Sequence, residues 1–224
     1  MKFNFFRIRA RKAKPFKEFQ LEKTEKGDYD SFHSKLLDSS LVILITGKRG
    51  SGKTALGMKM LEIFAHARKK CYAIGFSKGL PRFIKSVRSV EDVPNNSVLL
   101  IDEAAILFFA RDAMSKINKM ISKIMAIARH KGLLLILVSQ SSALLELNVL
   151  RLSDTLIFKE PSLMQAKFER KALQEMYKKI TPIFKSLQEK KKYFYIWDDE
   201  FEGLLSFDLP YFWNEKISKS FASW

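Results

Sequence analysis

The fold of this chain is decided by one stretch, Gly47-Lys48-Arg49-Gly50-Ser51-Gly52-Lys53-Thr54. It fits the pattern G-x-x-x-x-G-K-[ST], with a continuous apolar run at 41–46 before it and apolar residues at helical spacing over 55–69 after it. Glycines let the backbone turn tightly, so that successive N–H groups point at phosphate oxygens, and the N-terminus of the next helix adds a partial positive charge. The stretch therefore predicts a strand, a nucleotide-binding turn at 47–54 and a helix.

A second motif, Val98-Leu99-Leu100-Ile101-Asp102-Glu103, places two acids after a buried strand. We expect Lys53 to reach the β- and γ-phosphates of ATP, and Thr54 and Asp102 to hold Mg²⁺. Glu103 is predicted to polarise a water molecule for in-line attack on the γ-phosphate, which favours hydrolysis over transfer to a small-molecule acceptor. The alternative for Glu103 is a first-turn acid that complements a helix dipole.

A third motif is the apolar run 133–138, which ends in Ser139-Gln140. An amide at the end of a buried strand can contact both the γ-phosphate and the attacking water, so Gln140 is predicted to report whether ATP has been cleaved. The alternative is that Gln140 simply begins an exposed loop.

Strands that alternate with helical segments predict βαβ units and a mainly parallel sheet. We expect further strands at 71–76, 155–158 and 193–197, a hairpin partner at 204–207, and helices at 113–130 and from 161 to about 191, the last kinked or split at Pro182. The predicted fold class is α/β: a P-loop NTPase sheet of the ASCE, RecA-like type, flanked by helices, with a helical C-terminal addition.

Three regions are predicted: a basic N-terminal segment at 1–38, an ATPase core at 39–162, and a helical and hairpin extension at 163–224 that packs on the core. Residues 1–17 carry seven cationic side chains and no acid. They are either a basic arm or an edge strand, because apolar residues alternate with arginines over 6–11. Residues 18–40 are expected to form a connection and a short helix.

The amino-acid composition narrows the kinds of binding partner that we expect for this chain. The 224 residues contain 40 Lys plus Arg and 24 Asp plus Glu, a formal net charge of +16. This charge favours nucleic acid first and an anionic membrane surface second, although a basic surface without a specific partner is the alternative. The chain has a single cysteine and no apolar run of the roughly 20 residues that span a bilayer, so we expect a soluble, intracellular protein.

Together, the three motifs and the sequence Ala128-Arg129-His130-Lys131-Gly132 resemble the HerA–FtsK superfamily of nucleic-acid pumps. The compact size and the Arg-His-x-Gly…Ser-Gln pattern are most similar to virus genome-packaging ATPases, of the archaeal virus type, and to zonula occludens toxin-like ATPases. The resemblance covers about residues 40–162, including Phe158-Lys159-Glu160-Pro161-Ser162.

The resemblance implies a ring, usually a hexamer, that moves DNA through its centre while it hydrolyses ATP. For this chain it implies packaging of a viral genome into a procapsid, in the host cytoplasm or on the virion, with a capsid protein as partner. The alternatives are a conjugation or phage-extrusion DNA pump and, from another class, a nucleotide-regulated scaffold without turnover.

The resemblance also implies an arginine that acts on the neighbouring subunit's γ-phosphate. Arg129 is the first candidate, Arg151 and Arg111 are second, and capping of a helix C-terminus is the alternative for Arg129. DNA contacts that do not read sequence are expected from the N-terminal arm or from four cations after the second strand, namely Lys78, Arg82, Lys85 and Arg88. A solvated face is the alternative for these cations.

Overall fold

The computed structural model describes residues 18–76, 78–102, 114–139, 147–162, 171–214 and 217. Within these residues, nine strands form one mixed sheet in the order β1-β9-β8-β7-β2-β6-β5-β3-β4. This arrangement confirms the predicted α/β class.

Six neighbouring strands of the sheet are parallel to one another. They are β2 (Val42–Thr46), β3 (Cys71–Ile74), β4 (Ile84–Val87), β5 (Val98–Asp102), β6 (Leu134–Val138) and β7 (Thr155–Phe158). Strand β6 lies between β2 and β5, with Ile45 and Asp102 both paired to Val138. The three strands that carry the sequence motifs are therefore adjacent.

The remaining three strands are antiparallel and extend the sheet beyond β7. They are β8 (Tyr193–Trp197), β9 (Phe201–Ser206) and β1 (Gln20–Gly27). The sheet is thus continuous across the region boundaries that we drew at 38 and 162. A helical C-terminal addition is not confirmed, because the described residues after 162 form one long helix, the hairpin β8–β9 and an irregular segment at 207–214.

Two strands were not predicted. Strand β1 replaces the expected connection at 20–27, and all of its residues are exposed. Strand β4 lies after the second predicted strand, where no further strand was expected before residue 98, and only Ile84 of its four residues is buried. Both are edge strands, and an edge strand exposed to water does not show the apolar pattern of a buried one.

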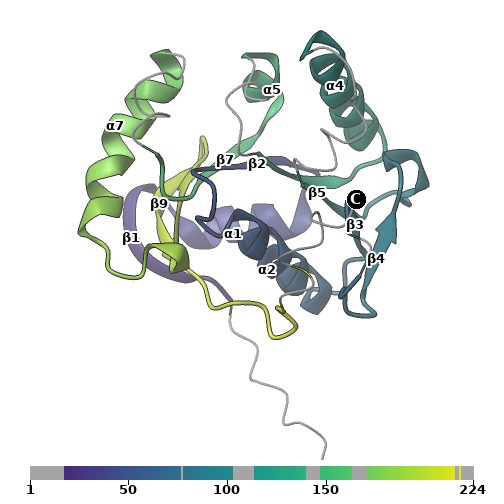
Figure 1. Ribbon diagram of the computed structural model, residues 1–224, viewed down its shortest axis with the longest axis horizontal. Coiled ribbons are helices and arrows are strands. Elements are labelled where there is room, and N and C mark those ends of the chain that lie inside the picture. Colours follow the sequence, from purple (N-terminus) through teal and green to yellow (C-terminus); the bar gives the residue numbers. More distant parts are fainter. Residues whose placement is uncertain are drawn as a thin grey trace, which may run out of the picture.

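Helices cover both faces of the sheet (Figure 1). Helices α1 (Tyr29–Asp38) and α2 (Lys53–His66) pack on one face, with Leu56 of α2 in the same apolar cluster as Ile43 and Ile45. Helices α4 (Met114–His130), α5 (Leu147–Leu152) and α7 (Lys171–Ser186) pack on the other face. Helix α7 continues past Pro182 and ends earlier than expected. Short 3-10 turns are η1 (Val90–Asp92) and η3 (Lys190–Lys192).

Asp198, in the turn between β8 and β9, joins α1 to the sheet. Its side chain is fully buried and accepts hydrogen bonds from Thr155 Oγ1 at 2.6 Å and from Lys35 Nζ at 3.1 Å. It also accepts a bond from the Glu200 backbone N–H at 3.0 Å. Because a buried carboxylate is stable only when its oxygens are paired, these three donors fix the position of the turn relative to α1 and β7.

Replacement of Asp198 by alanine should therefore lower the free energy of unfolding by about 3 kcal/mol, since Lys35 and Thr155 lose a shared buried partner. The matched control is Asp199→Ala, which removes an exposed carboxylate from the same turn and should change stability by less than about 0.5 kcal/mol. Chemical denaturation measures both values, and equal values for the two variants would contradict this role of Asp198.

Candidate functional site: a nucleotide-binding loop

Residues 47–52 connect the carboxyl end of β2 to the N-terminus of α2. Gly47 has φ of 143° and Gly52 has φ of 92°, a region of backbone space that side chains disfavour. A Cβ atom added at Gly47 would lie 2.8 Å from the Cβ atom of Lys159. The sequence motif thus produces a tight turn whose backbone leads directly into a helix, as a phosphate-binding loop requires.

Lys53 is only 4% exposed and spans the inside of this loop. Its Nζ donates to the Gly47 carbonyl oxygen at 2.7 Å and to the Lys48 carbonyl oxygen at 2.9 Å. The Ser51 hydroxyl is buried and has no hydrogen-bond partner among the described residues. An ammonium group held by carbonyls and an unsatisfied hydroxyl both suit a site that receives phosphate oxygens.

Thr54 and Asp102 come together although 48 residues separate them in the chain. Thr54 Oγ1 donates to Asp102 Oδ2 at 2.8 Å, and Asp102 is 2% exposed at the end of β5. A hydroxyl and a carboxylate at this distance are hard oxygen ligands of the kind that Mg²⁺ prefers, with phosphates and water completing an octahedral shell. The residues present therefore fit the predicted magnesium ion.

Glu103, Gln140 and Arg111 lie outside the described residues, so their predicted roles stay predictions. Their described neighbours are placed: Asp102 directly precedes Glu103, and the backbone N–H of Ser139 donates to the Ile45 carbonyl oxygen at 2.9 Å. The carboxyl ends of β5 and β6 thus lie beside that of β2, at the edge of the sheet that carries the phosphate loop.

Arg129 lies near the amino ends of the parallel strands, whereas the phosphate loop of its own chain lies at their carboxyl ends. Its guanidinium donates to the Leu152 carbonyl oxygen at 3.0 Å and to Asp154 Oδ1 at 3.3 Å. Asp154 Oδ2 in turn accepts the backbone N–H of Val42, at the start of β2, at 2.8 Å. These contacts favour the alternative of helix capping, because Leu152 is the last residue of α5. Action on a neighbouring subunit stays a prediction, as it does for Arg151, which is exposed on α5.

All four cations proposed for DNA contact are exposed, namely Lys78, Arg82, Lys85 and Arg88. Lys85 lies on β4 and Arg88 directly follows it, and β4 is one end of the sheet. A charged edge strand also discourages pairing with other chains, so exposure alone leaves a solvated face as the alternative.

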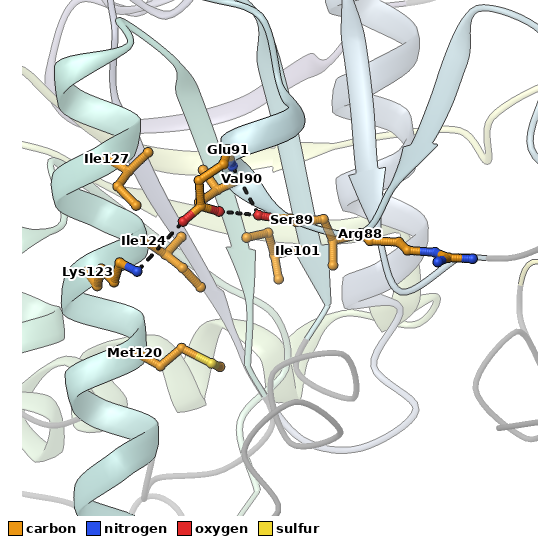
Figure 2. A pocket seen from close by; sticks show the side chains of 10 residues that line it. Arg88, Ser89, Val90, Glu91, Ile101, Met120, Lys123, Ile124 and Ile127 are labelled. Carbon is orange, nitrogen blue, oxygen red and sulfur yellow. Dashed lines mark hydrogen bonds and ion pairs between the residues drawn. The ribbon is translucent and has the colours of Figure 1, made fainter.

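A separate cavity of about 330 Å³ lies between η1 and α4 (Figure 2). None of the described phosphate-loop residues lines it. At its rim Lys123 Nζ lies 3.8 Å from Glu91 Oε1, and Ser89 donates to the same carboxylate. Arg88 also borders the cavity, but Figure 2 shows its side chain extending away from the others. The walls of the cavity are apolar and are formed by Ile74, Val90, Ile101, Met120, Ile124 and Ile127.

The site contains two residues to which the sequence analysis gave no role, Lys159 and Glu160, which directly follow β7. Glu160 accepts the Lys48 backbone N–H at 2.9 Å through its carbonyl oxygen, and its carboxylate pairs with Lys48 Nζ at 2.7 Å. Lys159 is fully buried beside the loop. Polar residues at the end of a buried strand are the signal that could have identified them, and the same signal did identify Asp102.

Replacement of Lys53 by alanine should weaken the binding of an ATP analogue about 10- to 100-fold, because a hydrogen bond to a charged group contributes about 1.5–3 kcal/mol. Lys70→Ala is the matched control, since it removes an exposed cation beyond the far end of α2. Isothermal titration calorimetry gives both affinities. Normal affinity of Lys53→Ala would argue against the loop as a phosphate site.

No protein-family model matches this chain, and no curated protein matches it significantly in sequence. Solved structures match its fold. The DNA-packaging ATPase B204 from Sulfolobus turreted icosahedral virus matches with a TM-score of 0.50 at 18% identity, over 75% of this chain and 97% of that chain. The genome-packaging NTPase B204 from Sulfolobus turreted icosahedral virus 2, in complex with ATP-γS, matches with a TM-score of 0.52 at 16% identity, over 76% and 98%.

A third structure, the pCW3 conjugation coupling protein TcpA in a monomer form with ATPγS, matches with a TM-score of 0.53 at 15% identity. The match covers 83% of this chain and 65% of TcpA, so this chain spans just under two thirds of that protein. None of the helices in the described ranges is both long and apolar enough to cross a membrane. The chain thus shares the overall α/β fold of these P-loop NTPase structures, which agrees with the predicted fold class.

Proposed function

We propose that this chain is an ATP-hydrolysing DNA translocase that packages a viral genome into a procapsid. The observation that carries the proposal is the hydrogen bond between Thr54 and Asp102 at the mouth of the phosphate loop. It brings a P-loop hydroxyl and a strand-end acid to one point, which suits a metal-bound triphosphate. The structures of B204, described as DNA-packaging and genome-packaging, support the choice of cargo.

In this proposal backbone N–H groups of 47–54 bind the phosphates of ATP, with the exception of those of Lys48 and Ser51, which donate to carbonyl oxygens of Glu160 and Lys48. Lys53 exchanges its two carbonyl acceptors for oxygens of the β- and γ-phosphates. Thr54 and Asp102 hold Mg²⁺, which neutralises charge on the phosphates when it is bound.

Hydrolysis requires a base and a group that orients water. Glu103 accepts a proton from a water molecule while the oxygen of that water attacks the γ-phosphorus in line. The bond between the γ-phosphorus and the β-phosphate oxygen breaks, which releases ADP. Gln140 contacts the γ-phosphate and this water. An arginine from a neighbouring subunit, with Arg129 preferred over Arg151 and Arg111, would stabilise the charge that develops in the transition state.

The proposed partners are DNA, further copies of this chain in a hexameric ring, and a capsid protein. The net charge of +16 and the exposed cations at 78–88 support a polyanionic partner. The proposed location is the host cytoplasm, or the virion once packaging has begun.

A second candidate, a DNA pump of conjugation, is supported by the match to TcpA, which covers more of this chain than the matches to B204. It uses the same nucleotide chemistry and differs in the partner that receives the DNA. A nucleotide-regulated scaffold remains the alternative of another class. It would bind ATP without hydrolysing it, whereas both pumps hydrolyse ATP.

Glu103→Gln should retain the affinity for an ATP analogue but lower steady-state hydrolysis at least about 100-fold, because the amide cannot accept the proton of water. Glu175→Gln, which changes an exposed glutamate on α7, is the control and should hydrolyse ATP normally. Phosphate release, measured with and without double-stranded DNA, reports both. If the wild-type chain binds ATP without turnover, the scaffold is favoured over a motor.

The affinity for double-stranded DNA should fall with salt, so that the logarithm of the binding constant declines linearly with the logarithm of salt concentration. Replacing Lys85 and Arg88 by glutamine should reduce the slope by about 0.9 for each DNA phosphate that the variant no longer neutralises. The matched control replaces Lys178 and Lys185, which are exposed on α7. An equal slope for the two double variants would argue against DNA contacts at β4.

A further inference from the structure

Lys159 lies under the start of the phosphate loop. It follows β7, which pairs with β2, and its backbone N–H donates at 2.8 Å to the carbonyl oxygen of Thr46, the last residue of β2. Its Cβ atom occupies the space beside Gly47, where a second Cβ would lie only 2.8 Å away. The loop can pass Lys159 at this distance because residue 47 has no side chain.

The Lys159 side chain then runs under the loop to its other end. Its Nζ lies 3.9 Å from the point that a Cβ atom of Gly52 would occupy. The same Nζ donates to the Lys191 carbonyl oxygen at 2.7 Å and to the Tyr193 carbonyl oxygen at 2.5 Å. The Lys191 carbonyl oxygen lies 3.4 Å from the same position, where a Cβ atom of residue 52 would be. Lys159 thus lies close to both ends of the loop and donates hydrogen bonds to the backbone at the start of β8.

In the described part of the chain, the Lys159 ammonium group is buried without an ion-pair partner. Lys159 is fully buried, and in the described part of the chain its Nζ has carbonyl acceptors and the face of the Phe207 ring, 4.7 Å from the ring centroid, but no ion pair. The neighbouring carboxylate, Glu160, pairs with Lys48 and Lys190. A buried unpaired cation costs free energy, and an anion bound nearby would offset that cost.

We propose that Lys159 is a positioning residue of the nucleotide site, which holds the 191–193 backbone against Gly52 and adds positive charge on the protein side of the phosphate loop. This inference rests on the proposed binding of a nucleoside triphosphate. It extends that function because it links the phosphates, through one side chain, to the antiparallel strands β8 and β9.

The pKa of the Lys159 amine agrees with its buried position beside the phosphate loop. Burial, followed by the charge of Lys53, lowers the pKa of Lys159 to about 7, and Glu160 acts in the opposite direction. Lys48 and Lys190 are the ion-pair partners of Glu160, and the ring that faces Lys159 Nζ, that of Phe207 directly after β9, is uncharged. Bound phosphates would favour the protonated amine and raise its pKa.

The pKa of Lys159 determines how the affinity for the nucleotide changes with pH. Above the pKa of the empty site, the amine must take up a proton when the nucleotide binds, so the affinity falls as pH rises until the pKa of the bound state is reached. The affinity of the wild-type chain for AMPPCP with Mg²⁺ should therefore fall between pH 7.5 and 9.0, by at most about tenfold per pH unit.

The test compares Lys159→Met, which keeps the length and apolar stem of the side chain, with Lys59→Met. Lys59 is also buried, but on α2 in an ion pair with Glu62. Lys159→Met should bind AMPPCP more weakly at pH 7.5, with an affinity that falls less steeply with pH than that of the wild type. Lys59→Met should lose stability yet keep the pH dependence of the wild type. The same pH dependence in Lys159→Met and the wild type would overturn the inference.

A second measurement needs only the wild-type chain. Calorimetric titration with AMPPCP at pH 8 in two buffers of different ionisation enthalpy should show net proton uptake, and its absence would overturn the inference even if Lys159→Met fails to fold. A wild-type chain that does not bind AMPPCP at all would instead refute the proposed nucleotide site. The two failures are therefore distinguishable.

Discussion

The site depends on one constraint, the insertion of β6 between β2 and β5. Because all three strands are parallel, their carboxyl ends meet at one edge, and the P-loop hydroxyl of Thr54 reaches the carboxylate of Asp102. Each strand is fully buried, so a one-residue shift in register would turn every side chain of a strand to the opposite face and disrupt its packing against both helical layers. The hydrophobic core thus fixes the chemistry at the edge of the sheet.

The phosphate loop is supported from the other side by the end of β7. Glu160 binds Lys48 of the loop through its backbone and its side chain. Lys159 bonds the end of β2 through its backbone N–H, and its side chain continues to carbonyl oxygens at the start of β8. The antiparallel strands are therefore more than an extension of the sheet. They provide the acceptors that hold a buried cation next to the loop, and this arrangement gives the nucleotide site a physical connection to the C-terminal hairpin.

Function and fold rest on different observations in this protein. The matches to B204 and TcpA show the fold alone, since their sequence identities are 18% or lower. The proposed nucleotide chemistry rests on this chain's own geometry at Lys53, Thr54 and Asp102. DNA and a ring are proposals that charge and fold support, and the contacts of Arg129 within its own chain show why a motif position does not assign a role in trans.

The sequence alone determined the phosphate loop and the buried parallel strands, with the exception of β4. Both are encoded locally, by glycine spacing and by apolar runs, and local patterns can be read without knowing the neighbours. Only the tertiary structure placed the edge strands β1 and β4, whose exposed residues have no apolar period. It alone also showed that Lys159 is buried and that Arg129 faces Asp154. A lysine or arginine has the same sequence signature in solvent and in a core, because its partners come from distant parts of the chain.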